Sequence, residues 1–318
     1  MRIVFWGTPA FAVPSLRALT DEGHDIAAVV TQPDRPAGRG RRLTPSPVKE
    51  VAEAEGIEVL QPERPRGEAF LERLAELAPD LSVVVAYGHI LRSEVLDLPR
   101  LGSINVHASL LPELRGAAPI NWAIARGHQK TGVTIMRMTP GMDEGPILLQ
   151  TEEPIGPEET ASELTARLSE LGAEALVEAL TLIDAGAIEE REQDHARATY
   201  APKVDRATAR IDWSRPAHEV AWHVRGMDAV PGAWSTLEGA PVKLFRPLPD
   251  PAVRAEGPPG TVVDADPDEG VLVACGEGAV WLREVQPAGR KRMEAGAWVR
   301  GRGVFAGQRF VDPPEAGA

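Results

Sequence analysis

The chain has 318 residues, of which 43% are hydrophobic, and its 47 Asp and Glu against 34 Lys and Arg give a net charge of −13. This length suits two domains, and no stretch approaches the ~18 consecutive apolar residues of a membrane span. The net charge argues against a protein whose whole surface grips nucleic acid. The single cysteine, Cys275, excludes an internal disulfide or a multi-cysteine zinc site. The first residues lack a signal-peptide pattern, so we expect a cytoplasmic protein.

Strand and helix patterns alternate through the first 185 residues. Apolar runs predict strands at residues 2–6, 26–30, 57–60, 81–86, 103–106, 131–138 and 147–150. One of the intervening helices begins at Ser46-Pro47, with serine as its N-cap, and ends before Gly56. A long amphipathic helix is expected over residues 161–185. The alternation predicts an α/β fold with a doubly wound, mostly parallel, Rossmann-like sheet.

The pattern changes in the second part of the chain. Charged, unpatterned residues 189–208 are typical of a linker. Short β-rich runs then follow at residues 233–237, 242–245, 261–263, 271–274 and 279–282, with a helix near 218–224. They predict a small β-barrel, OB-like domain. We therefore expect a catalytic domain over residues 1–188, a linker over 189–208 and a second domain over 209–318.

A doubly wound sheet often binds a dinucleotide, and the turn after the first strand tests this hypothesis. Its sequence is Gly7-Thr8-Pro9-Ala10-Phe11-Ala12, which lacks the second glycine that lets a pyrophosphate approach the backbone. No G-x-x-x-x-G-K-[ST] motif is present either. The sequence thus disfavours a nicotinamide or ATP enzyme.

Asn105 and His107 mark the expected site, at the carboxyl end of a predicted strand. In an open α/β sheet, ligands bind outside the carboxyl ends of the strands, and residues at i and i+2 point to the same side. Asp143 lies in a glycine-flanked turn between two later strands and can orient the imidazole. The three side chains can therefore converge on one substrate atom.

Two chemistries can use these residues. Ser109 suggests a serine hydrolase, but it lacks a G-x-S-x-G elbow and has no evident route to the imidazole. Without a nucleophile, the trio suits direct attack by an amine on a bound carbonyl. Asn105 and protonated His107 would stabilise the oxyanion, while Asp143 holds His107 and helps remove the amine proton. On the residues alone, a structural Asn-x-His pair is equally compatible.

Several strings resemble the signatures of the folate-dependent formyltransferases, in the same order and over nearly the whole chain. They are Asn105-Val106-His107-Ala108-Ser109-Leu110-Leu111-Pro112, Arg115-Gly116-Ala117-Ala118-Pro119-Ile120, Met142-Asp143-Glu144-Gly145-Pro146-Ile147, Val85-Ala86-Tyr87-Gly88 and Arg210-Ile211-Asp212-Trp213. Further matches lie at residues 5–11 and 31–40. Two departures are Ala108, where the family often has Gly or Pro, and Glu113, where relatives commonly carry a basic residue.

The resemblance implies 10-formyltetrahydrofolate as co-substrate, no metal, and Asn105, His107 and Asp143 as the catalytic set. It also implies that Ser109, Leu110, Leu111 and Pro112 line the folate site. The loop formed by Tyr87, Gly88, His89 and Ile90 would contribute to the pterin pocket. Main-chain groups and apolar walls suit such a flat heteroaromatic ligand.

The basic loop at residues 31–45 bears on the acceptor. It carries Arg35, Arg39, Arg41 and Arg42 against the single acid Asp34. Taken on its residues alone, this segment is interpreted as an ordinary solvated basic loop. With the resemblance, it is similar to the loop that contacts the tRNA acceptor stem, with Arg39 aligned to its most important arginine. The implied acceptor is the amino group of methionine charged on initiator tRNA.

Other readings of function stay open. A sugar-amine formyltransferase shares the catalytic string but lacks the basic loop, and a 10-formyltetrahydrofolate hydrolase needs neither the loop nor a second domain. A non-catalytic tRNA-binding protein has no reason to keep the catalytic trio. The run Arg290-Lys291-Arg292 offers a second phosphate contact for tRNA or, equally, a solvated turn. A monomer is the default expectation, since the sequence carries no signal of oligomeric state.

Overall fold

The computed structural model describes residues 1–37, 42–254 and 257–311. The chain divides into two compact units. Unit 1 comprises Met1–Pro119, Lys130–Pro154 and Thr165–Pro202, and unit 2 comprises Ile120–Gln129, Ile155–Leu164 and Lys203–Ala318. Among the helices described, none combines the length and apolar character needed to cross a membrane.

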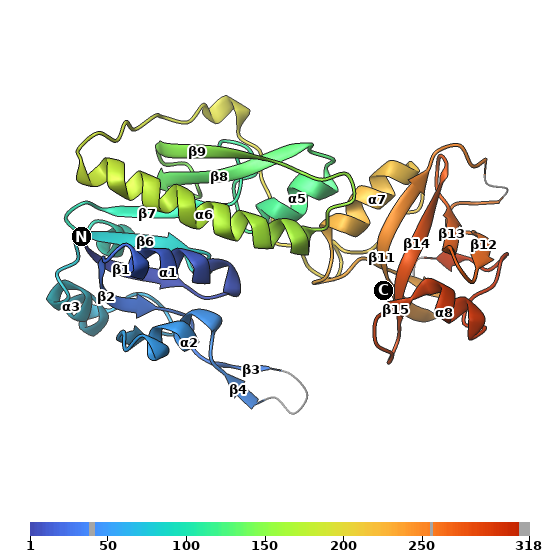
Figure 1. Cartoon of the computed structure of the whole chain (residues 1–318), viewed down its shortest axis with the longest axis horizontal. Coiled ribbons are helices and arrows are strands. Elements are labelled where there is room, and N and C mark those ends of the chain that lie inside the picture. Colours follow the sequence, from blue (N-terminus) through green and yellow to red (C-terminus); the bar gives the residue numbers. More distant parts are fainter. Residues whose placement is uncertain (38–41, 255–256, 312–318) are drawn as a thin grey trace, which may run out of the picture. The chain divides into compact units, whose positions relative to one another are not determined.

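A seven-stranded sheet forms the centre of unit 1 (Figure 1). Its strands, in chain order, are β1 (Arg2–Gly7), β2 (Asp25–Val30), β5 (Val59–Leu60), β6 (Leu81–Val85), β7 (Ser103–His107), β8 (Lys130–Arg137) and β9 (Ile147–Pro154). The spatial order is β5-β2-β1-β6-β7-β8-β9. The first five strands in that order are parallel, whereas β8 and β9 are antiparallel. The predicted doubly wound, mostly parallel sheet is confirmed.

The helices follow the expected alternation. In chain order they are α1 (Val13–Asp21), α2 (Pro47–Ala54), α3 (Glu68–Glu76), α4 (Ser93–Leu96), α5 (Pro119–Ala125), α6 (Ala161–Asp184), α7 (Ala217–Gly226) and α8 (Ala295–Arg300), with 3-10 helices η1 (Ala10–Ala12) and η2 (His195–Arg197). On one face of the sheet, α6 packs so closely that a Cβ at Gly172 would lie 3.0 Å from the Val106 side chain. On the other face, Trp6 and Val84 pack with Leu74 of α3. Both faces are therefore covered, which explains the continuous apolar strands.

A two-stranded hairpin replaces the loop expected after β2. It consists of β3 (Arg35–Ala37) and β4 (Arg42–Thr44), which pair antiparallel (Figure 1). Its base is tied by a 2.8 Å hydrogen bond between the hydroxyls of Thr31 and Ser46. Ser46 also caps α2, as predicted, by accepting from the Lys49 amide.

Unit 2 is built on an antiparallel sheet. Its strands are β10 (Trp234–Leu237), β11 (Ala240–Asp250), β12 (Val262–Asp266), β13 (Gly270–Ala274), β14 (Ala279–Pro287), β15 (Met293–Glu294) and β16 (Phe310–Val311). The path runs β12-β13-β14-β11-β10-β16, with β15 paired to β14. The edge strand β12 meets the segment that leads into β16, because Val262 accepts from the Gly307 amide and donates to the Gln308 carbonyl oxygen. This closure confirms the barrel-like prediction.

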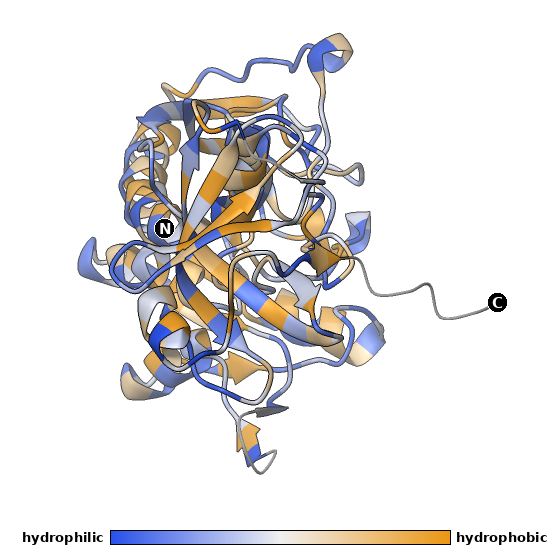
Figure 2. Ribbon diagram, turned by 90° about the vertical axis from the view of Figure 1, so that its right-hand side faces the viewer, coloured by the Kyte–Doolittle hydropathy of each residue, from blue (hydrophilic) through white to orange (hydrophobic). Residues whose placement is uncertain are grey.

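The sheet of unit 2 surrounds an apolar core. Leu244, Val273 and Leu282 from three strands pack there with Val220 of α7. Figure 2 shows bands of orange and blue along the strands nearest the viewer, which reflect the alternation of inward apolar and outward polar residues. The sequence patterns had not predicted α8, β15 or β16, which are short elements of two to six residues.

Candidate active site

His107 is the last residue of β7, between the parallel β6 and the antiparallel β8. Its side chain is 6% exposed, and its Nδ1 lies 3.7 Å from Oδ2 of Asp143. Its Nε2 lies 3.1 Å from the carbonyl oxygen of Leu114. The structure thus brings together two of the three predicted catalytic residues, at the edge of the sheet where ligands are expected.

The Asp143 carboxylate is also held by the backbone. Asp143 lies in the turn between β8 and β9, and its Oδ2 accepts a 2.7 Å hydrogen bond from the Gly116 amide. Gly116 has φ +116°, and a Cβ there would lie 2.8 Å from the Ala201 carbonyl oxygen, so only glycine fits. The carboxylate is therefore fixed to the chain that follows β7, facing the imidazole.

Asn105 stands two residues before His107 on the same strand, so both point to the same side of the sheet. Its side chain is half-buried, and within the described residues no group hydrogen-bonds to it. A partly buried amide without a protein partner can donate to a substrate oxygen. The three groups thus provide two donors and a carboxylate around the end of β7, which suits stabilisation of a developing oxyanion.

Ser109 takes no part in such a trio. It is fully buried, and its hydroxyl donates a 2.6 Å hydrogen bond to the Glu113 carbonyl oxygen. Both ring nitrogens of His107 face other oxygens. The geometry therefore gives no support to a serine nucleophile activated by His107.

The segment Ser109–Pro112, predicted to bind folate, is fastened by two side chains that the sequence patterns did not single out. Thr134 donates to the Ser109 carbonyl oxygen (2.6 Å) and accepts from the Leu111 amide (3.2 Å). Gln150 donates to the Leu111 carbonyl oxygen (2.8 Å). Leu111 itself is buried, whereas Leu110 and Pro112 are partly exposed. Thr134 and Gln150 lie on β8 and β9, at positions that belong to none of the motifs.

The other predicted folate segment, Tyr87–Ile90, follows β6. Burial against Trp6 raises the pKa of Tyr87 to about 12, and its hydroxyl has no partner among the described residues. The ring is therefore part of the core. Gly88 is exposed, His89 half-buried and Ile90 80% exposed. A ligand would meet this segment through its main chain, His89 and Ile90.

The basic hairpin presents an unneutralised surface. Arg35 donates to the Gln32 side chain (2.8 Å), and the exposed Arg42 has no side-chain partner within the described residues. Asp34 is instead paired with Lys49 at 2.8 Å, and hydrogen bonds from Lys49 and Gln61 lower its pKa. Arg39 and Arg41 lie outside the described residues. Across the described ranges, no group of three or more His, Cys, Asp or Glu is placed to hold a metal ion.

Comparison with known proteins gives the family. The "Formyl transferase" family model matches residues 1–180, and the "Formyl transferase, C-terminal domain" model matches residues 203–303. A methionyl-tRNA formyltransferase from Thiobacillus denitrificans is 50% identical over 98% of this chain and 99% of its own length. One from Symbiobacterium thermophilum is 49% identical over 99% of this chain and 97% of its own. This chain therefore belongs to the formyltransferase family.

Solved structures share the fold. HypX from Aquifex aeolicus in complex with tetrahydrofolic acid has a TM-score of 0.64 at 21% identity, over 93% of this chain and 46% of that longer chain. The sugar 3N-formyl transferase WlaRD, in the presence of dTDP and 5-N-formyl-THF, has a TM-score of 0.67 at 17% identity, over 92% of this chain and 99% of its own. At these identities the likeness establishes the architecture alone.

Proposed function

We propose that this chain is a methionyl-tRNA formyltransferase. It transfers the formyl group of 10-formyltetrahydrofolate to the amino group of methionine on initiator tRNA. The observation that carries the proposal is the 50% identity, over almost the full length of both chains, to a relative of that name. In this proposal the protein is a cytoplasmic monomer that uses no metal. Residues 1–188 form the catalytic domain, residues 209–318 form the tRNA-binding domain, and residues 189–208 link the two.

The proposed chemistry is direct attack of the amine on the formyl carbon. Asn105 and the Nδ1–H of a protonated His107 donate to the carbonyl oxygen as it becomes an oxyanion. Asp143 keeps the imidazole in place and receives a proton from the attacking amine. Attack forms the new C–N bond and gives a tetrahedral intermediate, whose collapse breaks the bond between the formyl carbon and the folate nitrogen. That nitrogen leaves with the proton that Asp143 has taken from the amine. The long 3.7 Å separation of His107 and Asp143 leaves Nδ1 free to donate to substrate.

The folate is proposed to bind along Ser109–Pro112 and Tyr87–Ile90. The Thr134 and Gln150 hydrogen bonds support this, because they give the first segment a fixed main chain on which a flat ligand can rest. Both segments follow strands that lie next to each other, β6 and β7.

The hairpin is proposed to contact the acceptor stem through Arg35, Arg39, Arg41 and Arg42. Because Asp34 is already paired with Lys49, it does not cancel these charges. Arginine binds phosphate oxygens in a bidentate manner and stacks on bases, which suits a hairpin that meets the end of a duplex.

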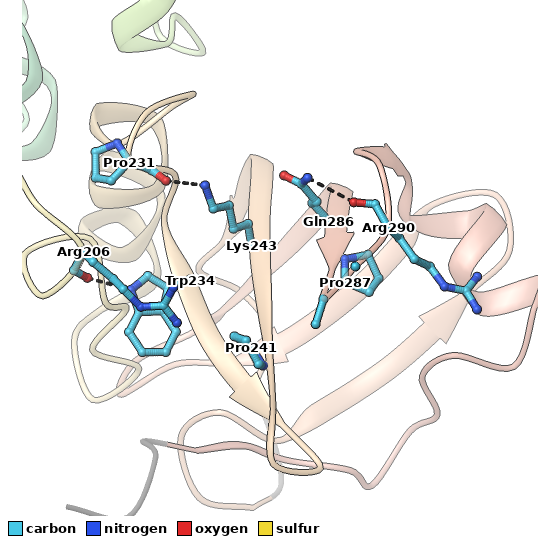
Figure 3. A pocket seen from close by; sticks show the side chains of 10 residues that line it. Arg206, Pro231, Trp234, Pro241, Lys243, Gln286, Pro287 and Arg290 are labelled. Atoms are coloured by element: carbon cyan, nitrogen blue, oxygen red, sulfur yellow. Dashed lines mark hydrogen bonds between the residues drawn. The ribbon is translucent and has the colours of Figure 1, made fainter. Parts of the chain in front are cut away.

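A second tRNA contact is proposed in unit 2, at a pocket of about 280 Å³ between β10, β11 and the loop after β14 (Figure 3). Three cations line it, and no Asp or Glu does. The Arg206 guanidinium lies 4.4 Å from the centre of the Trp234 ring. Lys243 donates only to the Pro231 carbonyl oxygen, and the Arg290 side chain has no partner in the described parts of the chain. Unpaired cations beside an aromatic face suit a phosphate next to an unstacked base.

The deciding experiment measures formyl transfer from 10-formyltetrahydrofolate to charged initiator tRNA, with free methionine and an amino-sugar nucleotide as parallel acceptors. Product on the charged tRNA alone supports the proposal. Transfer to the sugar would retain the catalytic residues but reject tRNA as acceptor. Formate release without an acceptor would favour a hydrolase.

A further inference from the structure

The Asp143 turn is braced by a side chain from a distant segment. Gln193 is 5% exposed, and its Nε2 donates to the carbonyl oxygens of Asp143 (2.9 Å) and Gly145 (2.7 Å). Asp143 has a φ of 50°, a backbone conformation that a non-glycine residue keeps only when its surroundings hold it. One amide thus ties the turn together on both sides of Glu144.

The orientation of the Gln193 amide is fixed in turn by Arg115. Arg115 is 2% exposed, and its Nε and Nη2 donate to the Gln193 Oε1 at 3.1 and 2.7 Å. With the oxygen facing this guanidinium, the amide nitrogen must face the Asp143 turn. The third side-chain contact of Arg115 is with His195 Nδ1, at 3.1 Å. Within the described residues, Gln193 therefore supplies the only oxygen acceptor of the Arg115 side chain.

The two neighbours of Arg115 hold the catalytic pair itself. The Leu114 carbonyl oxygen faces the His107 Nε2, and the Gly116 amide donates to the Asp143 carboxylate. Arg115 and its neighbours are therefore joined to Asp143 by two routes: through the Gly116 amide to the carboxylate, and through Gln193 to the backbone. Together the routes define the distance between the carboxylate and the imidazole.

We infer that Gln193 is a positioning residue for formyl transfer, acting through the backbone of Asp143 without contact with substrate. This inference rests on the proposed function. Residues 189–208 were expected to be only a linker, yet in this role the segment supplies part of the catalytic geometry. A misplacement of about 1 Å in such a site can cost as much as a hundredfold in rate.

Two substitutions distinguish the role of the hydrogen-bond donor of the Gln193 side chain from that of its acceptor oxygen. Gln193→Glu retains an oxygen for Arg115 but replaces the donor to the two carbonyls with a second oxygen. Gln193→Met removes both functions at similar length. We expect each variant to lower kcat by about tenfold to a hundredfold, with KM for the folate and for charged tRNA within about twofold of wild type. Ser103→Ala is the matched control, since it removes a buried 2.9 Å bond to the Leu96 carbonyl oxygen at the opposite end of β7.

A double-mutant cycle tests the route through Asp143. In an Asp143→Asn background, Gln193→Glu should change kcat by less than about twofold, because the group that it positions has already lost its function. An undiminished loss in that background would overturn the inference. So would wild-type kcat for Gln193→Glu, or a loss of kcat in Ser103→Ala as large as in the Gln193 variants.

Hydrogen exchange decides the structural claim without any substrate. Peptides that cover residues 139–146 should exchange faster in Gln193→Glu than in wild type or Ser103→Ala. Unchanged exchange there would overturn the brace even if Gln193→Met failed to fold. If the wild-type chain formylated no charged tRNA, the proposed function alone would be rejected, and the exchange result would still decide whether Gln193 holds the Asp143 turn.

Discussion

His107 and Asn105 differ in how many hydrogen-bond partners the protein provides for their side chains. Each ring nitrogen of His107 faces a protein oxygen, whereas the Asn105 amide has no hydrogen-bond partner within the described ranges. The Nε2 is within hydrogen-bond distance of the Leu114 carbonyl oxygen, at 3.1 Å, whereas Asp143 lies 3.7 Å from Nδ1, so the protein anchors His107 through Nε2. Asn105 is instead available to a substrate, and its loss should leave the fold almost undisturbed.

Asn105→Ala should therefore lower kcat by about 10²- to 10³-fold, the usual effect of removing one oxyanion donor. Binding of the folate and the melting temperature should stay close to wild type. Steady-state kinetics, folate titration and thermal unfolding check the three parts. A melting temperature well below that of wild type would mean that Asn105 is a structural residue.

His223 gives a pH dependence that is unconnected with catalysis. Burial, opposed by hydrogen bonds with the backbone of Ala209 and Arg210, lowers the pKa of this histidine from its ordinary 6.5. Its Nε2 has no partner among the described residues. Below pH 6.5 this histidine therefore binds a proton more readily in the unfolded chain than in the folded one. The contribution of His223 to the free energy of unfolding is full above pH 6.5 and is lost as the pH falls below that value.

Thermal unfolding at pH 7.5 and 5.5 measures this effect. Wild type should lose more stability on acidification than His223→Gln, which has no group to titrate at that position. An equal loss in the two proteins would assign the acid sensitivity to other groups.

At the scale of elements, the β3–β4 hairpin is a surface arm with little core of its own. Leu43 is 70% exposed, and the side chain of Arg42 beside it has no partner within the described residues. Removing one exposed charge from such an arm should not unfold unit 1.

Arg42→Ala should raise KM for charged tRNA several-fold, while leaving KM for the folate and the melting temperature unchanged. The salt dependence of tRNA use should also become shallower by roughly one phosphate contact. Arg17→Ala, on the exposed side of α1, is a suitable control. Equal tRNA kinetics in wild type and Arg42→Ala would remove this residue from the tRNA contact.

The elements that the sequence predicted well are those with a local cause. The apolar run at β6 and the Ser46-Pro47 helix start are read from neighbouring residues, and both are confirmed. The ordering of residues 189–208 has no local cause. Thr199, for example, accepts from the Leu114 amide across 85 positions of sequence. The same reason explains why motifs single out Asn105, His107 and Asp143 as candidates, whereas no motif marks Thr134 or Gln193.

At the scale of the whole molecule, charged residues are unevenly distributed along the chain. Residues 1–208 carry 32 acidic against 21 basic side chains, a charge of −11, whereas residues 209–318 carry 15 against 13, a charge of −2. The cations proposed to meet tRNA, such as Arg42, Lys243 and Arg290, are not paired with carboxylates in the described structure. A net negative protein can thus bind a polyanion at local sites.

This arrangement predicts a strong effect of salt on one substrate only. If about three phosphates are neutralised, affinity for tRNA should fall roughly forty-fold between 50 and 200 mM salt. KM for the folate should change little over the same range. A kcat/KM for tRNA that is insensitive to salt would argue against phosphate contacts as the source of affinity.

The closure of the β-sheet in unit 2 depends on a short stretch near the end of the chain. The amide of Phe310 donates to the Gly260 carbonyl oxygen at 2.8 Å, and residues 307 and 308 pair with Val262. A chain cut before Gly307 would keep most of the core but expose the edges of β10 and β12 to solvent. Unpaired strand edges are templates for other chains. A proteolytic nick at this point would therefore be expected to make the protein self-associate in a concentration-dependent manner, which light scattering would detect.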